Sequence, residues 1–241
     1  GGCVVEFAHQ RLSIIDLSKS ANQPFVKNGL VIVFNGEIYN YKQLKDSLIK
    51  KHGIEFRTSS DTEVVLEYYR LYGTDCLNHF IGMFAFAIYN EKTQHTFIAR
   101  DHFGIKPIFF TKIGKNFAFA SELKTLAEIN GFDKDINIDA LVQSINYLWI
   151  PDGKTMFKNC FKLPAAHFMI LDDNFNYEIS EYWKLEDKTL NDVSEKDVVD
   201  KLTKLFEDSI ERHMVADVPV SAFLSGGLDS SLICASTTNY S

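Results

Sequence analysis

Short apolar runs of strand length recur through the first half of the chain. Leu30 to Phe34 (LVIVF) is a continuous apolar run, which is the pattern of a strand buried on both faces. The turn-forming residues Asn35 to Glu37 follow it and predict its end. Phe84 to Tyr89 and Thr96 to Ala99 predict two neighbouring strands, because only a short polar turn separates them.

Two stretches between these strands predict helices. Asn40 can cap the first helix, whose apolar positions include Leu44 and Leu48. Ser60 and Glu63 form a capping-box pattern before the second helix. Strands around two helices favour a layered α+β domain.

The pattern changes towards the end of the chain. Residues 168–183 (FMILDDNFNYEISEYW) resemble a hairpin. From Ser194 onwards, apolar residues recur at helical spacing, with charged residues between them: Val198, Leu202, Leu205, Phe206 and Ile210. Val218 to Leu224 predicts a buried strand, and a glycine turn and a second helix follow it. This order is typical of the opening of a parallel α/β sheet.

Composition and charge exclude several classes of function. The chain has 241 residues and a net charge of −7, which disfavours a nucleic-acid partner because such a partner requires a basic face. Its four cysteines are widely spaced, which excludes the usual zinc spacings and favours a reducing compartment. No apolar run approaches the roughly 20 residues of a membrane span, and the start lacks the pattern of a signal peptide. We therefore expect a cytoplasmic protein with no membrane association.

The segment Ser225 to Ser231 (SGGLDSS) is the most specific motif in the sequence. Its two glycines permit a positive φ and a close approach of the backbone to a ligand. Successive N–H groups at such a turn, together with the N-terminus of the next helix, form a nest for an anion. The loop lacks the lysine of a Walker A loop. The simpler alternative is a helix cap provided by Asp229 or Ser230.

Three polar clusters in the first half are less specific when taken singly. They are RLSIIDL (11–17), FNGEIYN (34–40) and SSDTEV (59–64). Arg11 could be an ordinary surface arginine, and Asn35-Gly36 could be a plain hairpin turn. Asp61 lies in a first helical turn, where the helix dipole favours a carboxylate in any case.

Taken in order, these clusters resemble the class II glutamine amidotransferase domain of glutamine-hydrolysing asparagine synthetases. The resemblance covers nearly the whole chain and includes five further segments: GMFAFAI (82–88), RDHFGIKP (100–107), FAFASELKTL (117–126), KLPAAH (162–167) and EYWKL (181–185). It implies an Ntn-hydrolase-like sandwich of two β-sheets with helices, followed by the first elements of an α/β ATP-pyrophosphatase domain. We expect the amidotransferase domain over residues 1–170, a linker over 171–193, and the start of the synthetase domain over 194–241.

The resemblance also assigns roles to the residues of the three clusters. Arg11 would bind the carboxylate of glutamine, and Glu37 and Asp61 would hold its ammonium group. The side chain of Asn35 and the backbone N–H of Gly36 would form an oxyanion hole. Positions that line the same pocket are Leu12, Ile14 and Ile15.

The SGGLDSS segment closely resembles the signature of ATP pyrophosphatases, which cleave ATP between the α and β phosphates. The resemblance implies a loop that binds the pyrophosphate of ATP, with Asp229 associated with Mg²⁺. The residues expected to contact ATP are Leu224, Ser225, Gly226, Gly227, Asp229, Ser230 and Ser231.

The nucleophile of the family is an N-terminal cysteine whose own α-amino group serves as the base. Cys3 does not match it, because it lies only eight residues before Arg11 and is not followed by the Gly-Ile of the family. We interpret Cys3 as an ordinary strand residue, the chain as a fragment cut at both ends, and the fragment by itself as inactive.

The function implied is that of an asparagine synthetase that hydrolyses glutamine to ammonia and uses ATP to amidate aspartate, releasing AMP and pyrophosphate. The expected partners are therefore glutamine, aspartate and ATP with Mg²⁺, and a homodimer is compatible with the family. Two alternatives stay open. A related enzyme could amidate another carboxylate, such as a sugar acid, and a non-catalytic chain could serve as a nucleotide-binding module.

Overall fold

The computed structural model describes residues 4–151, 153–187 and 193–238. Nine strands form two antiparallel sheets within these ranges. The larger sheet has the order β1 (Phe25–Lys27), β2 (Leu30–Ile38), β3 (Gly82–Asn90), β4 (His95–Arg100), β8 (His167–Leu171) and β9 (Tyr177–Glu181). The smaller sheet has the order β6 (Asn116–Ala120), β5 (Phe109–Ile113) and β7 (Cys160–Lys162).

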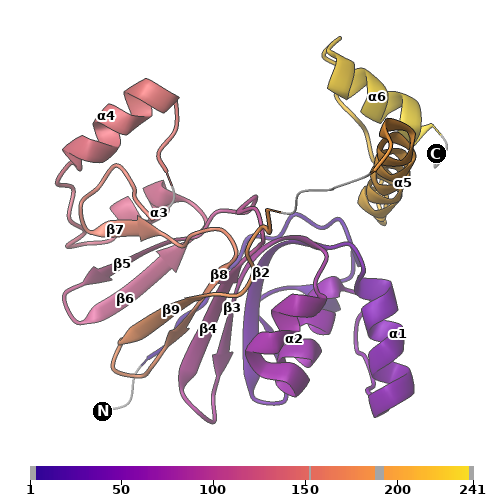
Figure 1. Ribbon diagram of the computed structural model, residues 1–241. Helices are drawn as coiled ribbons and strands as arrows, with labels where there is room; N and C mark the ends of the chain where they lie inside the picture. Colours follow the sequence, from indigo (N-terminus) through magenta and orange to yellow (C-terminus); the bar gives the residue numbers. More distant parts are fainter. Residues whose placement is uncertain (1–3, 152, 188–192, 239–241) are drawn as a thin grey trace.

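Helices cover one face of the larger sheet and flank the smaller one, as Figure 1 shows. The helices α1 (Tyr41–His52) and α2 (Asp61–Tyr72) lie against the larger sheet, and the 3₁₀ segment η2 (Gly73–His79) leads from α2 back to β3. The remaining described helices are η1 (Lys19–Ala21), α3 (Leu123–Ala127), α4 (Ile138–Tyr147), α5 (Glu195–His213) and α6 (Leu228–Thr237). None of the described helices is both long and apolar enough to cross a membrane.

Alternation along the strands of the larger sheet gives it two buried faces. Phe34, Phe86 and Phe97 belong to the cluster shared with α1 and α2. Residues of opposite parity, such as Val33 and Ala87, face Phe110 and other residues of the smaller sheet. Because side chains of successive strand residues point to opposite faces, one sheet packs against helices on one side and against a second sheet on the other. This layered arrangement confirms the predicted α+β sandwich.

Strand β2 is longer than its apolar run. The turn predicted at residues 35–37 is absent, because Asn35 and Gly36 continue the ladder opposite Ala85 and Phe84 of β3. The predicted strands at 84–89 and 96–99 are confirmed as β3 and β4. Pairing with β3 therefore overrides the local turn preference of the Asn-Gly pair and carries the strand past Phe34.

The start of α2 corrects a second detail. Ser60 is the N-cap and accepts a hydrogen bond from Thr62 N at 3.2 Å, but Glu63 does not complete a capping box. The Glu63 carboxylate instead accepts hydrogen bonds from Thr58 N at 2.8 Å and from Lys27 Nζ at 2.8 Å. Because Lys27 lies buried beside it, the Glu63 carboxylate pairs with this lysine and accepts from the backbone N–H groups before α2, and it does not bond to the N–H of Ser60.

The hairpin predicted at residues 168–183 is present as β8 and β9, which pair from His167 opposite Glu181 to Leu171 opposite Tyr177. The expected domain boundary at residue 170 consequently falls inside β8. Tyr182 also belongs to the first unit, because its hydroxyl donates to the carbonyl of Arg100 at 2.8 Å. We place the end of the first unit after β9.

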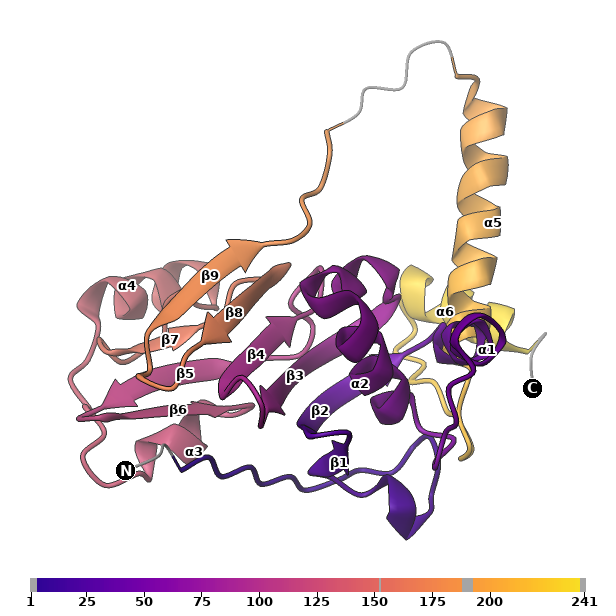
Figure 2. The same cartoon turned by 90° about the horizontal axis from the view of Figure 1, so that it is seen from below.

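The last part of the chain forms α5 and α6, which lie together beyond the edge of the first unit (Figure 2). The amphipathic helix predicted from Ser194 onwards is present as α5, and Ser194 caps it by accepting from Asp197 N at 3.2 Å. The strand predicted at 218–224 is not formed, and no described strand pairs with these residues. A buried strand needs a neighbour for its N–H and C=O groups, and Phe223 is 98% exposed here.

Candidate functional site

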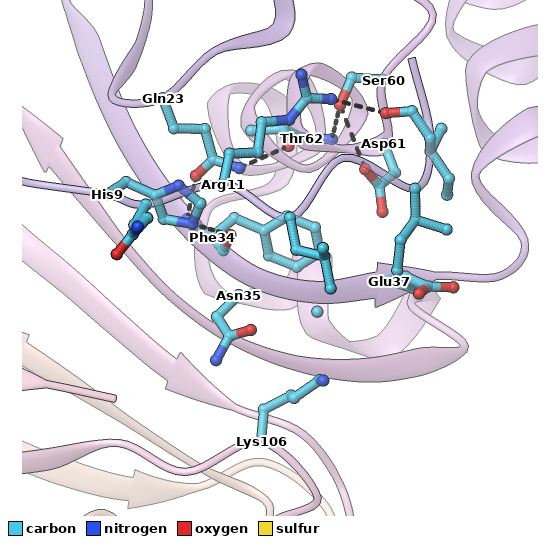
Figure 3. A pocket seen from close by; sticks show the side chains of 15 residues that line it. His9, Arg11, Gln23, Phe34, Asn35, Glu37, Ser60, Asp61, Thr62 and Lys106 are labelled. Carbon is cyan, nitrogen blue, oxygen red and sulfur yellow. Dashed lines mark hydrogen bonds between the residues drawn. The ribbon is translucent and has the colours of Figure 1, made fainter. Parts of the chain in front are cut away.

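A pocket of about 140 Å³ lies along β2, between the chain segment 9–15 and the start of α2 (Figure 3). Fifteen residues line it. They include every residue that the sequence assigned to glutamine: Arg11, Leu12, Ile14, Ile15, Asn35, Gly36, Glu37 and Asp61. Three segments that are far apart in the sequence thus meet in one place.

The wall of this pocket is the edge of β2 that faces away from β3. Phe34 N donates to Gln23 Oε1 at 2.6 Å, and Ile38 N donates to Asp61 Oδ2 at 3.0 Å. Backbone N–H groups alternate between the two edges of an antiparallel strand, so Gly36 N–H points to the same edge as these two. Its partner across the ladder, Phe84, is bonded instead to Asp101 through both its N–H and its C=O. The Gly36 N–H therefore faces the pocket.

Only glycine fits at position 36. Its φ is +150°, and a Cβ placed there would lie 2.0 Å from the carbonyl oxygen of Met83. A side chain would therefore push β2 away from β3 and displace the N–H group that lines the pocket. The hairpin-turn alternative for Asn35-Gly36 is excluded, because both residues lie inside a strand.

Arg11 is anchored inside the segment that carries it. Its Nη2 donates to the carbonyls of Ile15 at 2.7 Å and Asp16 at 2.5 Å, and its Nη1 donates to the carbonyl of Ser18 at 3.3 Å. A guanidinium carries five N–H donors, so these contacts fix its position and leave two donors for a ligand. These three contacts hold Arg11 against its own segment, where it lines the pocket.

Two carboxylates of the pocket, those of Glu37 and Asp61, form no ion pair with any residue that the structure describes. Burial, together with the nearby charge of Glu37, raises the pKa of Asp61 to about 6, although hydrogen bonds from Ile38, Thr62 and Ser60 act to lower it. Burial also raises the pKa of Glu37, against the attraction of Lys106 and His213. Figure 3 shows both acids beside the pocket, with Asn35 and Lys106 on its opposite side. A cationic ligand group would stabilise both charges.

Lys106 is a pocket residue to which the sequence assigned no role. Two buried side chains fix the loop that presents it: Asp101 accepts from Lys106 N at 2.9 Å and Ile105 N at 2.9 Å, and Arg100 donates to the carbonyl of Lys106 at 2.8 Å. All of these residues belong to the segment RDHFGIKP (100–107). The family resemblance included this segment, but it did not indicate what the loop does.

Asp16 is a second residue that the sequence left without a role. It has a φ of +55° and is 7% exposed. Burial opposes its ionisation, but hydrogen bonds from Ser18 and Ser59 outweigh it and lower the pKa of Asp16 to about 2. Asp16 Oδ2 accepts from Ser59 N at 2.7 Å, and this bond ties the Arg11 segment to the residues before α2. Nothing in the sequence distinguishes this acid from an ordinary surface aspartate.

The segment Ser225 to Ser231 forms an exposed turn and the first turn of α6. Gly226 has a φ of +82° and Gly227 is the N-cap, without a side-chain hydrogen bond to the free N–H groups of the helix. Neither Asp229 nor Ser230 acts as the cap, so the simpler alternative fails. Ser230 Oγ instead donates to the carbonyl of Gly227 at 3.1 Å. The N–H groups of the first turn are thus left for water or an anion, which fits a phosphate group.

The surroundings of this turn are open. Leu224 is 65% exposed, and the pocket of about 120 Å³ between Met214 and Thr238 is lined by none of the residues expected to contact ATP. Within the described ranges, no group of three or more His, Cys, Asp or Glu side chains is placed to hold a metal ion. Asp229 alone fits Mg²⁺ only as one ligand beside substrate phosphates, which is the usual way that this ion binds.

Comparison with known families decides what the first unit is. Residues 3–183 match the family model described as the glutamine amidotransferase domain. The chain belongs to the glutamine amidotransferase family. Residues 201–241 of this amidotransferase match a second family model, described as asparagine synthase.

Two curated relatives agree with both matches. The amidotransferase is 38% identical over 249 residues to a Methanocaldococcus jannaschii protein provisionally named asparagine synthetase (glutamine-hydrolyzing) 2, covering 95% of this chain and 47% of that protein. It is 38% identical over 239 residues to asparagine synthetase (glutamine-hydrolyzing) 3 of Bacillus subtilis, covering 96% and 38%. The solved glutamine phosphoribosylpyrophosphate amidotransferase of B. subtilis aligns over 89% of this chain and 45% of its own, with 18% identity and a TM-score of 0.49. The chain thus spans less than half the length of these curated relatives.

Proposed function

We propose that the pocket along β2 binds L-glutamine and hydrolyses its side-chain amide to glutamate and ammonia. The observation that carries this proposal is the meeting of Arg11, Glu37 and Asp61 with the inward-facing N–H of Gly36 in one pocket. A cation and two anions match the carboxylate and the ammonium group of an amino acid. A backbone N–H group matches the oxygen of its side-chain amide.

The charges select the amino-acid end of the ligand. The positive charge of Arg11 and its two remaining N–H groups, one on Nη1 and one on Nε, match the carboxylate, while the other three N–H groups are bonded to Ile15, Asp16 and Ser18. The ammonium group belongs beside Asp61 and Glu37, whose raised pKa values show that each carboxylate lacks sufficient compensation. Binding an ammonium group there lowers both pKa values and stabilises the complex.

The amide end lies along the edge of β2. We infer that the Gly36 N–H and the Asn35 side chain, which both line the pocket, donate to the oxygen on which negative charge develops during hydrolysis. None of the described lining residues is a cysteine. The resemblance assigns the attack to an N-terminal cysteine, and the chain's own residues orient the amide and stabilise the oxyanion. Loss of one such donor typically costs about 10²–10³ in rate.

The second unit begins a domain that uses ATP. We infer that the SGGLDSS turn binds the pyrophosphate part of ATP, because its glycines and the uncapped N-terminus of α6 present N–H groups to an anion. Mg²⁺, when bound with ATP, supplies neutralising charge, and Asp229 is the residue that would contact it. The relatives' names favour aspartate as the acceptor, which ATP activates by adenylation so that ammonia displaces AMP and forms asparagine.

The proposal is tested in the full-length enzyme by measuring glutamate and pyrophosphate release separately. Arg11→Ala should raise the KM for glutamine by roughly 10²-fold, as expected for a lost charged contact to the carboxylate, and leave synthesis from free ammonia unchanged. An equal loss with ammonia would contradict the glutamine assignment. Pyrophosphate release that requires a sugar acid and not aspartate would show that the sugar acid is the acceptor. No turnover with any of these substrates would favour a non-catalytic nucleotide-binding module.

A further inference from the structure

The segment that bears Arg11 is held from outside the amidotransferase unit. Asp217, which follows α5, accepts a hydrogen bond from Asp16 N through its Oδ2 at 2.7 Å. Its own N–H donates to the carbonyl of Ile14 at 2.9 Å. The first contact joins residues 201 positions apart in the sequence, and the second joins Asp217 to a residue of the same pocket segment. They form a two-point clasp between the pocket segment and the stretch that leads to the SGGLDSS turn.

The clasped peptide groups are those that position Arg11. Its guanidinium donates to the carbonyls of Ile15 and Asp16, which lie immediately beside the Ile14 carbonyl and the Asp16 N–H that Asp217 binds. Asp16 has a positive φ, a backbone conformation that costs free energy in a residue other than glycine. Contacts with other residues must therefore impose this backbone conformation on Asp16, and Asp217 supplies one of these contacts.

Neighbouring contacts seat the same stretch on the first unit. The rings of Tyr39 and His213 lie 4.2 Å apart, and Val215 packs against the core that lies between the helices and the larger sheet. Burial together with the charges of Asp217, Asp61 and Asp16 raises the pKa of Tyr41 to about 12, which agrees with the closeness of these three carboxylates. The clasp thus belongs to a packed contact and not to a single exposed hydrogen bond.

We propose that Asp217 is a positioning residue of the glutamine pocket, which is therefore completed by the second unit of the chain. Asp217 holds peptide groups 14–16 in the shape that orients Arg11, and it does so from the segment just before the SGGLDSS turn. This inference rests on the proposed binding of glutamine by Arg11. Its effect should appear in glutamine binding and not in the use of free ammonia.

The test uses the full-length enzyme and three variants. Asp217→Ala removes the acceptor, whereas Asp217→Asn keeps an oxygen that can accept from Asp16 N–H. Asp200→Ala is the matched control, because Asp200 lies exposed on α5. We expect Asp217→Ala to raise the KM for glutamine about tenfold, the effect of one hydrogen bond to a buried donor. Its kcat for glutamine hydrolysis and its synthesis from free ammonia should stay near the parent values.

The outcomes separate this inference from the function on which it rests. Recovery of the parent KM in Asp217→Asn, with no change in Asp200→Ala, supports the clasp. A KM within twofold of the parent in Asp217→Ala overturns it, as does failure of Asp217→Asn to restore the KM. A parallel loss of ammonia-dependent synthesis also overturns it, because Asp217 would then serve the synthetase unit. A parent enzyme that hydrolyses no glutamine would instead refute the proposed function itself.

Discussion

The carboxylate of Asp61 accepts a hydrogen bond from the backbone N–H of Ile38 at 3.0 Å while only 4% exposed. This contact joins the first turn of α2 to the pocket edge of β2. Burial nevertheless raises the pKa of Asp61 from 3.8 to about 6, so the ionised form is destabilised in the folded protein. The ionised carboxylate of Asp61 therefore lowers the free energy of unfolding of the protein. Such a group is expected where a bound ligand supplies the missing partner.

Asp61→Asn should therefore stabilise residues 1–241 at neutral pH. A raised folded-state pKa means that stability is fully present below pH 3.8 and is lost as the pH rises through about 6. Asparagine keeps the acceptor for Ile38 N–H without the charge, so we expect a gain of up to about 3 kcal/mol at pH 7.5. Urea unfolding at pH 7.5 and pH 3.5 measures it. A gain of equal size at both pH values would contradict the origin in charge burial.

Glutamine binding should weaken in acid. The ammonium group of the ligand binds ionised Asp61 and Glu37, and both pKa values are raised by burial. As the pH falls through about 6, Asp61 takes up a proton and its attraction for the ammonium group is lost. The KM for glutamine in the full-length enzyme should therefore rise between pH 7.5 and 5.5. A KM that stays flat over this range, or one that rises equally in Asp61→Asn, would argue against this role.

Gly36→Ala should disrupt the pocket and the sheet together. The new Cβ would lie 2.0 Å from the Met83 carbonyl, so β2 and β3 must separate locally. We expect a loss of about 3 kcal/mol or more in the free energy of unfolding, from strain and lost pairing. Gly114→Ala is the matched control, because Gly114 also has a positive φ, +59°, but nothing lies within 4 Å of its added Cβ. Similar losses in both variants would show that backbone strain alone, and not the close approach to Met83, decides the effect.

Asp229→Asn should separate the two proposed activities. Asp229 lies in the first turn of α6 and is not among the residues that line the glutamine pocket. In the full-length enzyme we expect pyrophosphate release to fall by at least about 10²-fold, as for loss of a charged group at a phosphate site. Glutamate release should stay within about twofold, since Asp229 contributes no side chain to the pocket. Equal losses would place Asp229 in a contact shared by both sites.

Local pattern and family resemblance predicted much of this protein, but for different reasons. The apolar runs of β3 and β4 and the amphipathic α5 follow from side-chain spacing alone. The continuation of β2 through Gly36 does not, because its cause is pairing with β3, which is distant in the sequence. The prediction of a strand at 218–224 was wrong for a related reason, since no strand among the described residues pairs with this segment.

The candidate site divides in the same way. Arg11, Glu37 and Asp61 could be singled out because their charges match an amino acid and their motifs resemble a family. Asp16 and Asp217 could not, because both act through contacts with backbone groups that no sequence pattern records.

Titration of ¹⁵N-labelled residues 1–241 with L-glutamine, followed by the backbone amide signals, tests the central claim most directly. The account predicts saturable shifts at Gly36, whose N–H faces the pocket, and at the amides around Arg11. Gly114 lies in a turn outside the pocket and should stay unchanged, and D-glutamine should produce no such shifts, because its ammonium and carboxylate groups cannot meet both charged walls at once. Shifts that are absent at millimolar L-glutamine, or that are equal for the two enantiomers, would contradict the assignment of this pocket to glutamine.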